Sequence, residues 1–416
     1  MKKRRYRQFI LAGLVLPMLV LVAGMWWLHR AMYHIVPADM EQIPSRCAVA
    51  ASDFHHEIEQ GRRFIKKFMR EHHAPSMSLA VAWKGRMIWS EAFGYINLEQ
   101  RIPATPETRY RINSVSKPIT AAALAKLLEA GDIGLDDPVQ RYVPDFPIKF
   151  YPITLRQVAS HTAGIRHYRS DEEVLNTRHF SSIAESLEVF AQDSLLFRPG
   201  SQVKYSSFGY NLLGRVVENA SGKEFTEFIR EAVLAPAHAQ GIGIEKNDTS
   251  QVRYYERNGV NPLTIVPPID QSIKYPSGGL VGTPAELVAF GSAYWQGKIV
   301  SPATVALFTR MQLLNSGEET GFGLGWELSR TPSAAKRLLM ETIAALGIYL
   351  PHATGFYDSI YHRGGSKGSI SGLVIYKNYD LVLAFASNIN GEGARPSWKL
   401  PTLMMEQFIR HVESAK

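Results

Sequence analysis

The sequence predicts an α+β fold, in which both ends of the body contribute strands to one antiparallel sheet and a helical region is inserted between them. Strand patterns of alternating or continuous apolar residues occur early and late in the body, and the first two flank a Lys-Gly turn typical of a hairpin. The strand-like segments are residues 76–83, 86–95, 324–328, 369–376 and 380–387. No long linker, repeat or low-complexity tract interrupts residues 53–416, which favours a single interleaved domain.

Helices are predicted from apolar residues at helical spacing and from residues that cap helix ends. Apolar side chains recur at this spacing in residues 54–72, and residues 114–130 carry an apolar face followed by a glycine, a good C-terminal cap. Residues 154–157 and 283–286 are capping boxes that open further helices. A closing helix is expected over about residues 397–412. These helices would flank the sheet and form the inserted region.

Composition and charge exclude several classes of protein. Of the 416 residues, 45% are apolar and 20% charged, as in globular proteins, and the single cysteine excludes a disulfide framework or a multi-cysteine metal site. The formal net charge is +8, but residues 1–30 hold six basic and no acidic residues, which leaves 40 basic against 38 acidic residues elsewhere. A nearly neutral body without a phosphate-binding loop argues against nucleic acid as a partner. No metal-ligand spacing is present, and no cofactor is expected.

The N-terminal segment is typical of a membrane anchor. An apolar run of twenty residues, 9–28, follows a Lys- and Arg-rich tip, and about 20 residues suffice to cross the hydrocarbon core. The basic tip predicts a cytoplasmic N-terminus. We therefore expect a single-pass inner or plasma membrane protein, with residues 1–30 as tip and transmembrane signal anchor, 31–52 as a linker and 53–416 as an extracytoplasmic (periplasmic) domain. The alternative is a cleaved signal peptide, which would give a secreted domain.

Three Ser-x-x-Lys sequences are candidate pairs of nucleophile and base. Residues i and i+3 share one helix face, so the amine can take the proton of the hydroxyl, and the helix N-terminus favours the alkoxide. The three pairs are Ser114 with Lys117, Ser201 with Lys204, and Ser333 with Lys336. Ser201 follows Pro-Gly in an expected loop, and Ser333 begins an ordinary amphipathic helix. Ser114 begins the strongest predicted helix, with a proline in its first turn, and is favoured.

Ser366 is a competing nucleophile, because residues 364–368 spell G-x-S-x-G. In α/β-hydrolases this sequence joins a strand to a helix, and an acid and a histidine follow it in the chain. Here the following residues alternate like a strand, and little chain remains for the partners. We therefore favour Ser114.

The segment around Ser114 resembles the first motif of the serine β-lactamase and penicillin-binding protein family, especially its class C and esterase-like branch. Further landmarks follow in the order of the family, and the resemblance covers roughly residues 55–410. They are LRQVASHTAGI (155–165), FRPGSQVKYSSFGYNLLGRVVENASG (197–222), PSGGLVGTPAELVAFG (276–291), FGLGWEL (322–328) and the third motif at His362-Arg363-Gly364. SVSKPIT, ALAKLLEAG, PVQRYVP and SHTAGIRHY are most similar to the mitochondrial serine β-lactamase-like branch, regarded as peptidases rather than antibiotic hydrolases.

This resemblance implies a serine β-lactamase-like fold and acyl transfer through Ser114. It implies Lys117 as the general base and Tyr205, from the second motif, as a proton relay to the leaving group. The backbone N–H groups of Ser114 and Gly365 would form the oxyanion hole. The expected function is therefore that of a membrane-anchored extracytoplasmic serine hydrolase, a peptidase or esterase rather than an efficient β-lactamase. Its partner would be a small-molecule or peptide substrate.

Two positions on the substrate side depart from the motifs of the family. Ser207 stands where the second motif has asparagine, and a hydroxyl has a shorter reach toward a substrate amide. His362 replaces the third-motif lysine and carries only a partial charge near neutrality, so Arg363 would have to compensate beside Gly364. A helical insertion near 331–356 does not align with the family. These departures leave open an alternative, a catalytically inactive membrane-anchored binding or scaffold domain of the same fold.

Overall fold

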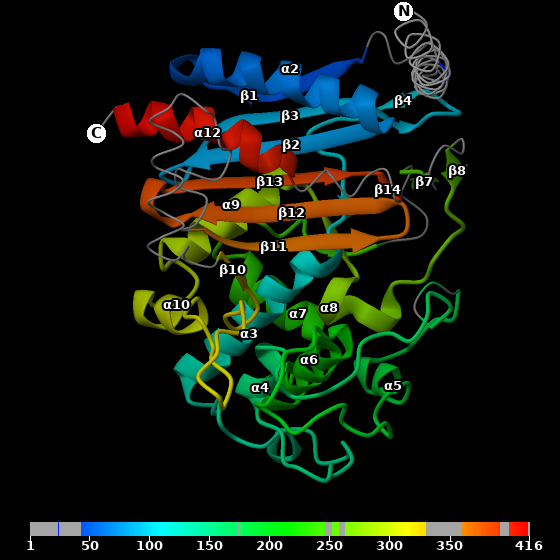
Figure 1. The fold of residues 1–416 in the computed structure, drawn as a ribbon, viewed down its shortest axis with the longest axis vertical. Coiled ribbons are helices and arrows are strands. Elements are labelled where there is room, and N and C mark those ends of the chain that lie inside the picture. Colours follow the sequence, from blue (N-terminus) through cyan, green and yellow to red (C-terminus); the bar gives the residue numbers. More distant parts are fainter. Residues whose placement is uncertain are drawn as a thin grey trace, which may run out of the picture.

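The centre of the structure, a computed structural model, is an antiparallel sheet with the strand order β1-β3-β2-β13-β12-β11-β10 (Figure 1). The structure describes Gly24 and residues 43–173, 175, 177–245, 252–257, 263–329, 359–391 and 399–414. The strands are β1 (Ser45–Ala50), β2 (Ser76–Trp83), β3 (Arg86–Asn97), β10 (Glu327–Leu328), β11 (Ser359–Ser366), β12 (Ser369–Tyr376) and β13 (Leu381–Ser387). Early and late strands meet where β2 pairs with β13, so the predicted assembly of one sheet from both ends is confirmed.

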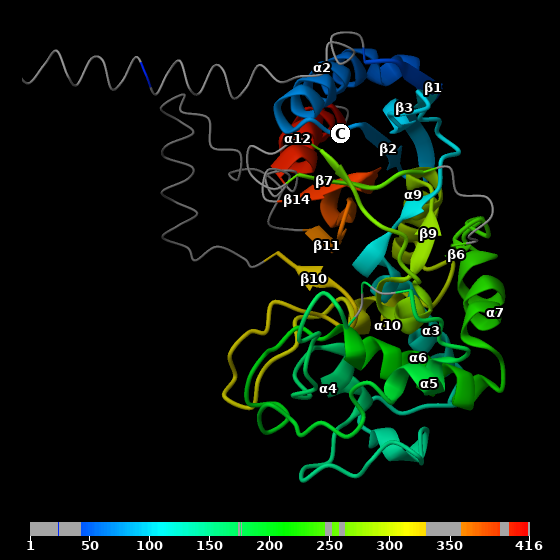
Figure 2. The ribbon, with the colours of Figure 1, turned by 90° about the vertical axis from the view of Figure 1, so that its right-hand side faces the viewer.

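Alternating side chains give the sheet two different faces. Leu381 and Leu383 of β13 pack with α2 (His55–His72) and α12 (Lys399–Ser414), whereas Val382 and Ala384 belong to the core on the opposite face. Helix α9 (Pro284–Trp295) covers that opposite face (Figure 2). The predicted helices that flank the sheet are therefore present on both sides.

The inserted helical region lies below the β10–β11 edge of the sheet in the view of Figure 1 and is built around α3. Its helices are α3 (Ser116–Ala130), α4 (Leu155–Ala159), α5 (Ile183–Leu187), α6 (Ser207–Ser221), α7 (Phe225–Ile229), α8 (Tyr275–Gly278) and α10 (Pro302–Phe308). Helix α3 buries residues on nearly all sides, as expected of a helix at the centre of a core, and ends at Gly131 with φ 81°. Both predicted capping boxes, at Thr154 and Thr283, are formed.

Several element boundaries differ from the sequence prediction. Residues 45–50, expected within the linker, form β1, an edge strand whose mostly exposed side chains give no alternating pattern. Only the last two residues of the expected strand 324–328 are extended, because Gly325 turns the chain with φ 87°. Strand β11 was not expected, since its Gly-Gly pair and polar residues hide the strand pattern. The closing helix runs from Lys399 to Ser414.

Two sequence predictions fall outside the described residues. The anchor over 1–30 is undescribed apart from Gly24, and the helical insertion over 331–356, which includes Ser333 and Lys336, is undescribed throughout. In the part of the chain that is described, no helix combines the length and the apolar character needed to cross a membrane.

Candidate active site

Ser114 lies in a tight turn between a short strand and the central helix. Strand β5 (Tyr110–Arg111) leads into the 3-10 turn η3 (Asn113–Val115), and α3 begins two residues after Ser114 rather than at it. Asn113 adopts φ 49°, a left-handed conformation that asparagine tolerates better than most residues. Its side-chain amide donates to the Ser369 hydroxyl at 3.0 Å, so β12 holds the turn in place.

Lys117 is completely buried, and its amine lies at the centre of a group of three oxygen atoms. Its Nζ lies 3.2 Å from Ser114 Oγ, 3.1 Å from Ser207 Oγ and 2.5 Å from the Ser277 carbonyl oxygen. A neutral amine has two N–H donors and one lone pair. If the two donors bind Ser207 and Ser277, the lone pair is left for the hydroxyl proton of Ser114.

The surroundings of Lys117 favour this neutral form. Burial is the main factor that lowers its pKa well below the ordinary value, and repulsion by Lys274 lowers it further, while Glu327 opposes these effects. A lysine with a depressed pKa can accept a proton near neutral pH. The structure therefore brings the predicted pair of Ser114 and Lys117 together, in surroundings that lower the pKa of the amine.

Tyr205 and Ser207 come from the N-terminal end of α6, where Ser206 caps the helix by accepting from Gly209 N–H. The Tyr205 ring lies 4.5 Å from the His161 ring, centroid to centroid, and the Lys117 amine lies 4.9 Å from the Tyr205 centroid. Burial raises the pKa of Tyr205, an effect that hydrogen bonds with Ser114 and Ser207 partly offset. Tyr205 therefore stays protonated and suits a proton donor better than a base.

His161 and His167 fix the backbone in this region. His161 Nδ1 accepts from Ser206 N–H and His167 Nδ1 from Ser207 N–H, each at 3.2 Å. Burial lowers the pKa of His167 to about 4 and that of His161 well below its ordinary value, so both rings are neutral. Neutral rings can accept these hydrogen bonds, which hold the second motif in place.

The third motif lies on β11, and its residues have distinct surroundings. His362 is 1% exposed, its ring centroid lies 6.3 Å from that of Tyr205, and burial lowers its pKa to about 4. Arg363 binds Glu327 through Nε and Nη2, and it is not among the residues that line the cavity described below. A neutral His362 and a paired Arg363 do not supply the free cation expected from the third motif.

Steric crowding explains why glycine occupies position 364. A Cβ atom at this position would lie 2.5 Å from the Ile112 carbonyl oxygen and would clash with Ser371 Oγ. Only glycine lets β11 approach the turn that carries Ser114 so closely. This approach sets Gly365 beside the nucleophile.

A cavity of about 270 Å³ opens in front of Ser114. Four predicted site residues line it, namely Ser114, Tyr205, Ser207 and Gly365. Other lining residues were not anticipated, and they include Asn113, His167, Tyr168, Asp171, Lys274, Ser277 and Lys367. Among the described residues, no group of three or more His, Cys, Asp or Glu side chains is arranged to hold a metal ion.

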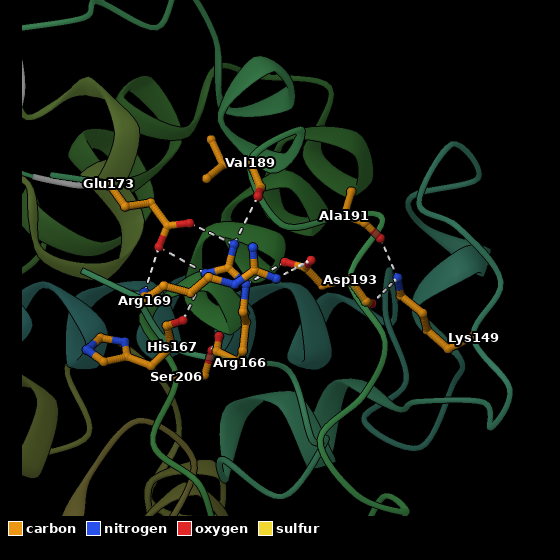
Figure 3. Close-up of polar contacts among 9 residues, drawn as sticks. All are labelled: Lys149, Arg166, His167, Arg169, Glu173, Val189, Ala191, Asp193 and Ser206. Carbon is orange, nitrogen blue, oxygen red and sulfur yellow. Dashed lines mark hydrogen bonds and ion pairs between the residues drawn. The ribbon is translucent and has the colours of Figure 1, made fainter. Parts of the chain in front are cut away.

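An ion-pair cluster around Arg166 supports one wall of this cavity and was also missed (Figure 3). Arg166 is 7% exposed and binds Asp193 and both carboxylate oxygens of Glu173, the latter at 2.9 and 2.7 Å. Its guanidinium also donates to the His167 carbonyl, and its own carbonyl accepts from Ser206 Oγ at 2.7 Å. Arg166 therefore links the loop that carries His167 to the second motif. Sequence spacing gives no signal for a cluster of this kind.

The two competing nucleophiles that the structure describes, Ser201 and Ser366, lack a comparable arrangement. Ser201 is exposed in a loop and donates to the Arg198 carbonyl at 2.7 Å. Ser366 ends β11, where the chain turns directly into β12, so no helix follows it as an elbow requires. The preference for Ser114 over both residues agrees with this geometry.

Comparison with known proteins agrees with the fold. Human serine beta-lactamase-like protein LACTB, mitochondrial, is 32% identical over an alignment of 324 residues, and the match covers 61% of this chain and 58% of the human protein. The chain thus matches less than two thirds of that relative's length. The octameric penicillin-binding protein homologue from Pyrococcus abyssi superposes with a TM-score of 0.67 at 23% identity, over 85% of this chain and 77% of that one. EstCE1, a hydrolase with promiscuous acyltransferase activity, superposes with a TM-score of 0.65 at 20% identity, over 84% of this chain and 98% of that one.

The family model described as Beta-lactamase matches residues 62–400, which is most of the chain. This match covers every motif around the cavity, from Ser114 to Gly365. The resemblance predicted from those motifs is thereby confirmed. The chain belongs to the beta-lactamase family and has the serine β-lactamase-like, penicillin-binding-protein-like hydrolase fold.

Proposed function

We propose that this protein is a serine hydrolase that forms an acyl-enzyme on Ser114. The observation that carries the proposal is the buried amine of Lys117, 3.2 Å from Ser114 Oγ and with a pKa well below its ordinary value. A buried lysine without an anionic partner is costly to a fold, and activation of an adjacent hydroxyl gives it a chemical purpose.

The first half of the reaction is acylation. Lys117 Nζ takes the proton of Ser114, whose oxygen attacks the substrate carbonyl carbon, while the carbonyl electrons move onto its oxygen. The backbone N–H groups of Ser114 and Gly365 stabilise that oxyanion. When the intermediate collapses, the bond to the leaving group breaks, and the proton passes from Lys117 through the Tyr205 hydroxyl to the departing oxygen or nitrogen.

The second half returns the enzyme to its starting state. A water molecule gives a proton to Lys117 Nζ and attacks the acyl carbon, and the ester bond to Ser114 breaks. The proton then returns to Ser114 Oγ, and the product leaves as an acid. Ser207 assists both halves because its hydroxyl accepts from Lys117 and keeps the lone pair of the amine directed at Ser114.

The substrate is proposed to be a peptide or an ester rather than a β-lactam. Ser207 is too short to reproduce both amide contacts of an asparagine, and His362 is neutral where the third motif has lysine. EstCE1, which shares the fold, is a hydrolase with acyltransferase activity, so the fold accommodates acyl transfer beyond β-lactams.

The decisive experiment is labelling by a fluorophosphonate probe, which reacts with activated serines. The full-length protein is solubilised in detergent and compared with Ser114→Ala and with Ser201→Ala, whose serine lies in an exposed loop. We expect the wild type and Ser201→Ala to label equally and Ser114→Ala not to label. An unlabelled wild type, beside a related hydrolase that labels, would refute catalysis and favour the inactive scaffold.

We further propose that residues 1–30 anchor the domain outside the cytoplasm. The support is the apolar run of twenty residues behind a basic tip. Alkaline carbonate extraction should leave the protein in membranes, and external protease should digest the domain once it has access to the outer side of that membrane. Release of the full-length chain by carbonate would contradict the anchor.

A further inference from the structure

Lys274 is a buried lysine without a role in the reaction outlined above. It ends the 3-10 turn η6 (Ser272–Lys274), is 4% exposed, and lines the same cavity as Ser114. Its ammonium makes no hydrogen bond or ion pair with any residue that the structure describes. A polar side chain this deeply buried and facing a cavity requires a partner.

The two described acidic groups that act electrostatically on Lys274, Glu245 and Asp171, are held by other cations. Glu245 accepts from Arg111 Nε at 2.9 Å, and both side chains are less than 10% exposed. Asp171, at the cavity wall, pairs with Lys367 at 3.2 Å. These two pairs are electrically balanced, so that among the residues that the structure describes Lys274 is left as the uncompensated cation of the cavity.

Lys274 also remains charged under ordinary conditions. Burial is the main cause that lowers its pKa to about 8, with a smaller contribution from Arg111, while Glu245 and Asp171 oppose the shift. At neutral pH the amine is therefore mostly protonated. Lys117 lies against Ser114 and also has a pKa well below its ordinary value, to which repulsion by Lys274 contributes. The two lysines of the site are therefore suited to different tasks.

We infer that Lys274 binds a carboxylate of the substrate, so that the preferred substrates carry a negative charge close to the scissile bond. This inference rests on the proposed function, because it names the substrate class of that site. It also explains how the site manages with a neutral His362 and an Arg363 engaged by Glu327. The cation that recognises the substrate comes from η6 rather than from the third motif on β11.

Two matched pairs of esters test the inference on the acyl side and on the leaving-group side. The p-nitrophenyl monoester of glutaric acid is compared with p-nitrophenyl valerate, and 4-acetoxybenzoate with its methyl ester. In the wild type, at least one anionic member should have the higher kcat/KM. Lys274→Met should reduce that preference roughly 10- to 100-fold, the range for a hydrogen bond to a charged group. Lys274→Arg should retain part of it, and the exposed Lys298→Met should leave it unchanged.

A binding measurement separates this inference from the proposed function. Calorimetric titration of glutarate, with neutral glutaramide as the control ligand, uses the Ser114→Ala protein, which needs no catalysis. Binding that is lost in the Ser114→Ala/Lys274→Met protein supports the anion site even if the wild type fails to label. Equal glutarate binding in both proteins, or unchanged ester preferences in a folded Lys274→Met, would overturn the inference while the labelling of Ser114 still stood.

Discussion

Lys274→Met is expected to make the protein more stable at neutral pH while it impairs substrate binding. The pKa of Lys274 is about 8 in the folded protein against 10.5 for a free lysine. One pKa unit corresponds to 1.36 kcal/mol, so keeping this amine charged inside the fold costs about 3 kcal/mol. Methionine is unbranched, apolar and adaptable in shape, so it can fill the space without that cost.

The lowered pKa of Lys274 also predicts how the stability gained by Lys274→Met depends on pH. Because the folded pKa is lowered, the unfolded chain binds more protons between pH 8 and 10.5, and the wild-type stability rises with pH across this window. Below pH 8 both states are protonated and the cost is constant. The advantage of Lys274→Met should therefore be about 3 kcal/mol at pH 7 and should disappear as the pH approaches 10.5.

Urea-induced unfolding followed by circular dichroism, at pH 7 and at pH 10, measures this difference. Lys298→Met, which replaces an exposed lysine, serves as the control and should match the wild type at both values. A Lys274→Met protein that is less stable than the wild type at pH 7, or whose advantage is the same at both values, would refute the reasoning. The first result would mean that the ammonium has a stabilising partner within the fold.

Three further predictions concern the reaction and the packing around it. Lys117→Met should lower kcat for p-nitrophenyl acetate by about 10²- to 10⁴-fold with the fold retained by circular dichroism, and wild-type kcat in this variant would contradict its role as base. Gly364→Ala should lower the free energy of unfolding by about 1–3 kcal/mol in urea titrations, because its Cβ would lie 2.5 Å from the Ile112 carbonyl oxygen. Gly365→Ala serves as the control, because a Cβ atom at position 365 has space. Lys274→Met should move the acidic limb of the pH profile of kcat/KM for p-nitrophenyl acetate to higher pH. Loss of the repelling cation raises the pKa of Lys117, and Lys117 must be neutral to act as base. An unmoved acidic limb would contradict this coupling.

The sheet could be predicted from the sequence wherever one local signal defined it. Strands β2, β3, β12 and β13 are rich in apolar residues, and the turn at Lys84-Gly85 fixes the first hairpin. Strand β1 gives no such signal, because it lies at an edge and exposes most of its side chains. Its place in the sheet is determined by pairing with β3, a contact between segments about forty residues apart.

The candidate site also contains residues that could be predicted from the local sequence and residues that could not. Ser114 and Lys117 are three residues apart, and the helical turn that runs from η3 into α3 brings them together. Lys274 reaches the cavity, and the Arg166 cluster supports its wall, only through the tertiary fold, and nothing in their local sequence distinguishes them from surface charges. Their significance comes from burial and from the absence or presence of a partner, neither of which periodicity encodes.

The neutral histidine at the third motif becomes understandable when the charges of the cavity are considered together. Lys274 lowers the pKa of Lys117 by repulsion, while its own pKa of about 8 leaves it mostly charged at neutral pH. A lysine at position 362 would instead place another buried cation within electrostatic reach of Lys117, which already acts on the His362 ring. His362, with a pKa of about 4, adds no charge at neutral pH. With position 362 uncharged, Lys274 is the cation available for substrate recognition and Lys117 is the amine available for proton transfer.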